Sequence, residues 1–127
     1  MKSIVVVAAV IERDGRFLLT LRPEGTHLAH HWEFPGGKCQ PYETHEEALR
    51  RELYEELDIV AAVGGLVHEV THAYPDRSVA LYFYACSFRG EPKGMIGQQV
   101  RWVRRDELAA LPFPDADAEL IRVLASA

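Results

Sequence analysis

Three glutamates that would share one face of a helix are the residues of this sequence best suited to chemistry. Glu52, Glu55 and Glu56 stand at positions i, i+3 and i+4, about one helical turn apart. At that distance their charges repel one another unless protons or a cation neutralise them. Hard divalent cations such as Mg²⁺ prefer oxygen ligands and commonly act together with substrate phosphates. The spacing therefore predicts a divalent-metal site for a phosphate-bearing substrate.

The segment ahead of these glutamates is suited to meeting a phosphate. Gly36 and Gly37 permit close approaches that a Cβ would prevent, and a backbone carbonyl there is a further candidate cation ligand. Lys38 follows as a point charge for a phosphate group. Thr44 and Glu47 then have the spacing of a capping box, which predicts that a helix begins directly after Thr44.

An apolar seam predicts how this helix packs. Leu49, Leu53 and Leu57 recur every four residues, so they can be buried while the acids stay along the edge of the packed face. The alternative is an acidic, solvated helix face, which is the ordinary interpretation of a glutamate-rich helix. Glu43 and Arg51, at fixed offsets from the glycines, favour the metal site over that alternative.

The same residues resemble a known family motif. Gly37, five residues, Glu43, seven residues and then RELYEELDI match the Nudix box, here residues 37–59. One fixed position departs, because Asp58 stands where the family usually has glycine. That position follows the helix in a left-handed conformation, which Asp tolerates better than most residues. A motif this long and gapped is much more specific than a short glycine pattern.

The resemblance extends over nearly the whole chain. VVAAVIERDGRFLLTLRP, HWEFPGGK, YPDRSVALYFYA and FPDADAELI resemble the MutT-like branch of the family, which includes 8-oxo-dGTP diphosphatases and CTP pyrophosphohydrolases. The resemblance implies a nucleoside triphosphate pyrophosphohydrolase, in which water attacks the β-phosphorus and yields the monophosphate and diphosphate. CTP, dCTP and 8-oxo-dGTP are the candidate substrates.

One departure from the relatives keeps other functions open. Many of them place a glutamate directly before the Gly97-Gln98 pair, where this chain has Ile96. A non-catalytic, nucleotide-binding Nudix module is therefore one alternative. A diphosphatase that acts on ADP-ribose or a nucleotide sugar is the other, since the box alone fits it equally well.

The resemblance also implies a metal site and a catalytic set. Mg²⁺ is the expected cofactor, with Mn²⁺ as an alternative, and it would lower the pKa of a bound water and neutralise phosphate charge. Glu52 is the first candidate for orienting or deprotonating the water. Arg51 is expected to pair with Glu43 and brace the loop against the helix. The implied metal ligands are the Gly36 carbonyl, Glu52, Glu55 and Glu56, and the catalytic set is Arg51, Glu52, Glu55 and Glu56.

The candidate residues for binding substrate are Arg22, Phe34, Lys38, Arg77 and Asp117. Lys38 and Arg22 are assigned to phosphate, although Arg22 could equally be an exposed strand end. Phe34 is expected to lie against the base together with Tyr74. Arg77 would contact the base, or it would only be an exposed residue of the turn in which it lies. Ile4, Val6 and Val79 could line the same slot, with plain core packing as the favoured alternative for these aliphatic residues.

Asp117 is the candidate reader of the base. It stands where MutT-like proteins have a purine-reading asparagine and where cytidine-preferring relatives have Asp. A carboxylate can accept a hydrogen bond from an exocyclic amine, and a protonated one can also donate, as an oxidised purine would require. The alternative role is helix-start electrostatics.

Three histidines, His27, His30 and His31, lie in a predicted polar loop. They lack the spaced Cys/His partners of a zinc site, so a solvated loop is the favoured interpretation. His27 matches a position near the nucleotide in the relatives.

Composition limits the classes of partner. The formal net charge of −5 and the absence of a basic block argue against binding to a nucleic acid polymer. Two cysteines without a CxxC pair predict a reducing, cytoplasmic location. No apolar run approaches the ~18 residues that a bilayer span needs, so no membrane partner is expected. We expect a monomer or homodimer with a small-molecule nucleotide substrate.

Strand and helix signals predict one α/β domain over residues 1–127. Asp14-Gly15 is the signal of a hairpin turn, and Asp115 is the expected N-cap of the last helix. Periodicity predicts a mixed sandwich, and the resemblance implies the Nudix fold, a mixed β-sheet core between α-helices. The predicted strands are 3–11, 16–21, 59–63, 66–73, 78–88 and 100–103, and the predicted later helices are 105–110 and 116–125.

Overall fold

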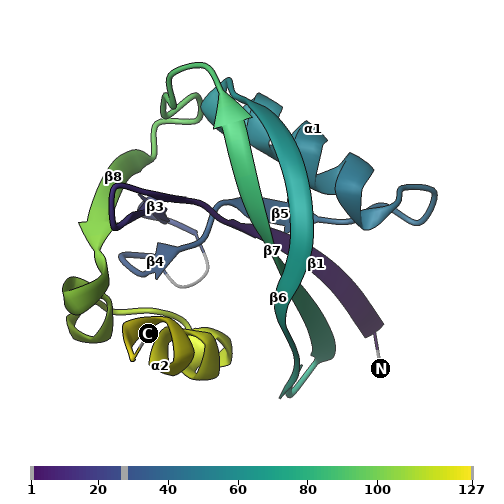
Figure 1. Ribbon diagram of the computed structural model, residues 1–127. Coiled ribbons are helices and arrows are strands. Elements are labelled where there is room, and N and C mark those ends of the chain that lie inside the picture. Colours follow the sequence, from purple (N-terminus) through teal and green to yellow (C-terminus); the bar gives the residue numbers. More distant parts are fainter. Residues whose placement is uncertain (1, 27–28, 127) are drawn as a thin grey trace.

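Two β-sheets stand between two helices in the computed structural model, which describes residues 2–26 and 29–126 (Figure 1). The first sheet has the order β5-β1-β7-β6, and β1 runs parallel to β7 and antiparallel to β5. This confirms the predicted mixed sheet between helices. The strands of this sheet are β1 (Lys2–Val10), β5 (Gly36–Lys38), β6 (Val60–Tyr74) and β7 (Arg77–Arg89).

The second sheet is built around β3, which pairs with three other strands. Its members are β2 (Glu12–Arg13), β3 (Arg16–Leu21), β4 (Trp32–Glu33) and β8 (Gln99–Arg104). The sequence predicted one sheet core, and the structure divides it in two. Asp14 and Gly15 adopt φ values of 53° and 74° between β2 and β3, which is the predicted hairpin turn.

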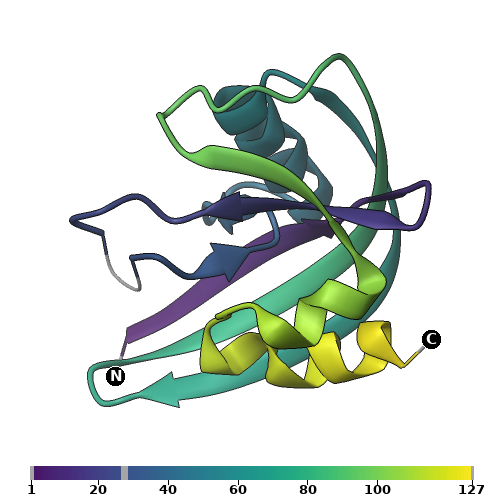
Figure 2. The same ribbon diagram turned by 90° about the vertical axis from the view of Figure 1, so that its left-hand side faces the viewer.

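The helices lie on opposite sides of the sheets, as the two views in Figures 1 and 2 show. Val7 and Ala9 of β1 pack in one apolar cluster with the leucines of α1 (His45–Leu57). Ala8 and Val10, the alternate residues, pack in a second cluster with α2 (Ala118–Ala125). Strand β1 is therefore buried on both faces, which explains its nearly continuous apolar sequence.

Helix α1 begins and ends as its sequence predicts. Thr44 accepts a hydrogen bond from the Glu47 backbone, and the Glu47 side chain accepts one from the Thr44 backbone, so the capping box is complete. Asp58 ends the helix with φ of 58° and ψ of 37°, the left-handed conformation expected there. The departure from glycine at this position is thus accommodated without changing the helix end.

Two local expectations were wrong, the break at Gly64-Gly65 and the N-cap at Asp115, and the short helix over residues 105–110 was confirmed. The predicted break at Gly64-Gly65 is a bulge inside the continuous strand β6, where a Cβ on Gly64 would lie 2.9 Å from the Ala85 carbonyl oxygen. The short helix over residues 105–110 has the predicted bounds, Arg105–Ala110, and is of the 3-10 type. Asp115 is not the N-cap of the last helix, because Asp115–Asp117 forms a 3-10 turn and α2 begins at Ala118, two residues later than predicted.

The longest helix in the described part of the chain is α1, with 13 residues. None of the described helices combines the length and the apolar character that crossing a membrane requires.

Candidate active site

The leucine seam of α1 directs the acidic row toward the glycine strand. Leu49, Leu53 and Leu57 are fully buried, as their spacing predicts. The Glu52 side chain is 16% exposed and that of Glu55 is 52% exposed. The row therefore runs from the packed interior outward along one edge of the helix.

Gly37 makes room for Glu52. A Cβ on Gly37 would lie 2.4 Å from the Glu52 carboxylate, which is closer than any side chain allows. A Cβ on Gly36 would lie 2.0 Å from the Val7 carbonyl oxygen, because β5 packs directly on β1 at that point. Packing against the β1 backbone therefore requires Gly36, whereas a Cβ on Gly37 would force the Glu52 side chain to move. The two glycines bring the β5 backbone against the first carboxylate of the row.

Arg51 connects the loop to the helix. Its guanidinium donates to both oxygens of Glu43, at 2.7 and 2.8 Å, so the predicted pairing is confirmed. It also donates to Glu52 at 2.9 Å and Glu55 at 3.0 Å, and to the Lys38 carbonyl oxygen at 3.2 Å. The hydrogen bonds from Arg51 hold the pKa of the Glu43 carboxyl at about 2. The Arg51 guanidinium therefore offsets part of the negative charge of Glu43, Glu52 and Glu55.

Glu56 lies where negative charge is least compensated. Burial raises its pKa to about 8, with further contributions from Glu52, Glu33 and Glu55. Within residues 2–26 and 29–126 no three carboxylate, imidazole or thiol groups stand together as a formed metal cluster. The donor chemistry nonetheless fits a hard divalent cation, because these are crowded carboxylates beside a glycine backbone.

A pocket of about 460 Å³ opens beside this row. It is lined by seven of the residues predicted for substrate or metal, and by Tyr74, Ile4, Val6 and Val79. The structure thus brings together segments that are far apart in the chain. The seven predicted residues are Arg22, Phe34, Gly36, Lys38, Glu56, Arg77 and Asp117, whereas Glu52 and Glu55 are not among the lining residues.

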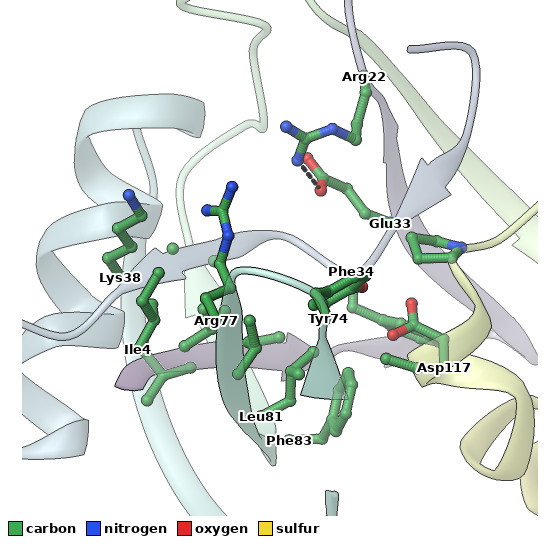
Figure 3. Close-up of a pocket in the computed structure, with 18 of the residues that line it drawn as sticks. Ile4, Arg22, Glu33, Phe34, Lys38, Tyr74, Arg77, Leu81, Phe83 and Asp117 are labelled. Carbon is green, nitrogen blue, oxygen red and sulfur yellow. Dashed lines mark hydrogen bonds and ion pairs between the residues drawn. The ribbon is translucent and has the colours of Figure 1, made fainter. Parts of the chain in front are cut away.

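The pocket has basic side chains together with Glu56 at one end and Asp117 at the other. Figure 3 shows Lys38 and Arg77 toward α1 and Asp117 on the opposite side, beside the last helix. Phe34 forms part of the wall between them, with its ring 5.9 Å from Phe83 and stacked 5.8 Å from Phe113. The pocket can therefore receive an elongated molecule that is anionic at one end.

Asp117 faces the pocket and does not cap the helix. It occupies the N-cap position of α2, but its side chain makes no capping hydrogen bond. The residue is 4% exposed. Burial raises its pKa to about 7, with a smaller contribution from Glu33. The carboxyl group is thus available to both accept and donate a hydrogen bond near neutral pH.

Glu33 is a charged residue of the pocket that was not predicted from the sequence. It accepts a hydrogen bond from Arg22 at 2.9 Å, and burial raises its pKa while Arg22 partly offsets the effect. The negative charge of Glu33 also contributes to the raised pKa values of Glu56 and Asp117. One signal was present in the sequence: a charged residue stands between two aromatic residues, Trp32 and Phe34, just ahead of the glycines.

Two loops beside the site were singled out from the sequence, the one with Ile96 and Glu91 and the one with the three histidines. Ile96 is 60% exposed at a loop surface, and the nearby Glu91 is exposed and is not among the residues that line the pocket. His27 lies outside the described residues. His30 is exposed, and its ring lies 3.6 Å from the Glu24 carboxylate.

The fold is shared with solved proteins. The chain superimposes on the solution structure of the Escherichia coli ORF135 protein with a TM-score of 0.88 and 38% identity, over 99% of this chain and 91% of that one. It matches the MutT protein of Staphylococcus aureus with a TM-score of 0.80 and 34% identity, over 99% and 98% of the chains. These similarities define the class as a MutT-type α/β domain.

The family follows from the sequence comparisons. The NUDIX domain model matches residues 6–123. The 8-oxo-dGTP diphosphatase of Haemophilus influenzae is 44% identical over 97% of this chain and 93% of its own length. The CTP pyrophosphohydrolase of Escherichia coli is 40% identical over 95% and 90%. The chain belongs to the NUDIX domain family.

Proposed function

We propose that this chain hydrolyses a nucleoside triphosphate to the monophosphate and diphosphate, using a divalent cation, Mg²⁺ or Mn²⁺. The observation that carries the proposal is the pocket, in which an acid-edged helix and two basic side chains meet at one end and an aromatic wall with Asp117 stands at the other. The similar proteins are named for this reaction, on 8-oxo-dGTP in one case and on CTP in the other.

The metal would be held by Glu52, Glu55, Glu56 and the Gly36 carbonyl. When bound, it supplies positive charge beside the phosphates and lowers the pKa of a water molecule. Lys38 and Arg77 stand on the side of the pocket where they could bind the phosphates. Arg51 supports the row by holding Glu52 and Glu55 in place.

The phosphate chain and the base would take opposite ends of the pocket. Placing the phosphates toward α1 leaves the nucleoside against Phe34 and Tyr74, with Asp117 at its far edge. Arg22 is held by Glu33 at 2.9 Å, so a phosphate would compete with that carboxylate for the guanidinium. CTP or dCTP and 8-oxo-dGTP remain the candidate substrates, since Asp117 can accept from a cytosine amine or donate as an acid.

A nucleotide panel tests the proposal. Ribo- and deoxynucleoside triphosphates, 8-oxo-dGTP, ADP-ribose and a nucleotide sugar are incubated with Mg²⁺, and diphosphate and monophosphate are measured. The expected result is diphosphate release from a pyrimidine triphosphate or from 8-oxo-dGTP. Turnover of ADP-ribose alone would assign the chain to the other diphosphatase class. Calorimetric binding of a nucleotide without turnover would favour a binding module.

Glu52→Gln tests the catalytic assignment. The substitution keeps the size of the side chain and removes its charge, so we expect kcat to fall by roughly 10³-fold or more while the fold is unchanged. Circular dichroism and steady-state kinetics measure the two effects. Glu46→Gln, at an exposed glutamate of the same helix, is the matched control. Wild-type turnover in Glu52→Gln would remove Glu52 from the catalytic set.

Asp117→Asn tests the base reader. An amide both accepts and donates at every pH, whereas the carboxyl of Asp117 changes between these roles around its pKa of about 7. We expect the ratio of kcat/KM for CTP to that for 8-oxo-dGTP to change several-fold and to lose its pH dependence. Asp115→Asn, at an exposed carboxylate of the same turn, is the control. An unchanged ratio would exclude Asp117 as the reader.

A further inference from the structure

The C-terminal end of α1 is covered by the loop that precedes β8. The backbone N–H of Lys93 donates to the Leu57 carbonyl oxygen at 2.9 Å, and that of Met95 donates to the Glu56 carbonyl oxygen at 3.0 Å. The last carbonyl groups of a helix have no partner within the helix itself. The loop therefore completes the turn that carries Glu56.

Gln98 makes a second contact to the same carbonyl group. Its side-chain nitrogen Nε2 donates to the Glu56 carbonyl oxygen at 3.0 Å, although the two residues are 42 positions apart. Its side-chain oxygen Oε1 accepts from the Ile96 backbone N–H at 3.0 Å. The residue is 9% exposed, so these bonds are largely shielded from water. One amide thus joins the loop to the acid-bearing helix.

The loop backbone is folded closely around this glutamine. A Cβ on Gly94 would lie 2.2 Å from the Gln98 carbonyl oxygen, so only glycine allows the approach. At the tip, Met95 and Ile96 are 55% and 60% exposed. The tip side chains thus project outward while the polar part of the loop holds α1. The contact to Glu56 is consequently made by the glutamine amide and the backbone.

We propose that Gln98 is a positioning residue, which sets the Glu56 backbone and thereby the place of its carboxylate in the metal site. The inference rests on the proposed function. Groups that orient metal ligands from behind typically change metal affinity or activity by 10- to 100-fold when they are removed. The positioning role of Gln98 also gives the loop a function that does not depend on which side chain stands at position 96.

Two variants and one control test the inference. Gln98→Ala removes both hydrogen bonds. Gln98→Glu keeps the size and the acceptor for Ile96 but cannot donate to Glu56 as a carboxylate. Gln99→Ala changes the same residue type at the next position, which is exposed. Mn²⁺ binding is measured from the electron paramagnetic resonance signal of the free ion, and thermal unfolding is recorded without metal.

We expect both Gln98 variants to bind Mn²⁺ about 10-fold more weakly than wild type, and Gln99→Ala to match wild type. In turnover assays the Mg²⁺ concentration for half-maximal rate should rise by the same factor, with KM for the nucleotide within about twofold of wild type at saturating Mg²⁺.

Wild-type Mn²⁺ affinity in Gln98→Glu would overturn the inference, whether or not Gln98→Ala unfolds more easily. Weakened Mn²⁺ binding without any turnover by the wild-type chain would uphold the positioning role and contradict the proposed function. No Mn²⁺ binding by the wild-type chain would contradict both.

Discussion

At the scale of single residues, the pocket depends on buried carboxyl groups whose charge is costly. Asp117 is almost completely buried and has no basic partner among the causes of its pKa shift, which are burial and Glu33. Glu33 differs because Arg22 partly compensates it. Burying a carboxyl group without a basic partner makes the fold less stable than an apolar residue at the same position would. Such a carboxyl group is therefore a candidate functional residue.

The free-energy cost of burying the ionised Asp117 carboxylate predicts how the free energy of unfolding depends on pH. Its pKa of about 7 in the folded chain lies above the ordinary value of 3.8, so the folded state binds more protons between these two values. The free energy of unfolding therefore falls as pH rises from about 4 to about 7. Asp117→Asn should remove this loss and stabilise the chain at pH 8 relative to wild type, by at most about 4 kcal/mol.

Urea unfolding of wild type and Asp117→Asn at pH 5 and pH 8 measures the difference, with Asp115→Asn as the exposed control. Equal stability differences at the two pH values would show that Asp117 does not titrate in this range.

Residue-scale prediction from the sequence succeeded where a motif fixed the spacing and failed where contacts are long-range. Arg51 and Glu43 could be paired from the resemblance to the family motif, and the structure confirms the pair. Glu33 could not be placed, because its neighbours Arg22, Glu56 and Asp117 come from three other segments. Its short strand carries no periodicity that would show which way the side chain faces.

At the scale of elements, the site depends on the contact between β5 and α1. Lys38 and Gly36 are strand positions paired to β1, and Glu52 occupies the space that Gly37 leaves open. Loop, strand and helix are then fixed to one another by the Arg51 guanidinium. The acid row is thus held by packing and ion pairs before any ligand arrives.

Gly37→Ala tests this contact. The new Cβ would lie 2.4 Å from the Glu52 carboxylate, so Glu52 must move. We expect kcat to fall at least about 10²-fold, since small misplacements of a catalytic group have effects of this size. Gly65→Ala is the matched control, because a Cβ there meets nothing within 4 Å. Kinetics and thermal unfolding of both variants give the comparison, and wild-type kcat in Gly37→Ala would contradict the role of the close approach.

Element boundaries show what local sequence can predict. The capping box and the left-handed Asp58 were predictable because they depend on residues within one turn. The glycine pair in β6 reads locally as a break, yet pairing with β7 carries the strand through it as a bulge. The start of α2 was misplaced because Asp115–Asp117 forms a 3-10 turn that ends in a pocket residue.

At the scale of the whole molecule, the pocket lies between parts that the sequence separates widely. Ile4, near one end of the chain, and Asp117, near the other, both line it. The alternation of β1 directs one set of side chains to α1 and the other to α2, so the strand packs against both helices. The predicted fold class was confirmed, whereas the division into two sheets required knowledge of which strands pair.

The central claim is that α1, packed behind the glycine strand, holds a divalent cation against a nucleoside triphosphate in the pocket. The most direct measurement is a crystal structure with Mn²⁺ and a nonhydrolysable triphosphate, in which anomalous scattering locates the ion. We expect an anomalous peak in contact with Glu52, Glu55 or Glu56 and with a phosphate oxygen, and we expect the base to lie beside Asp117. A nucleotide bound with its ion away from all three glutamates would contradict it.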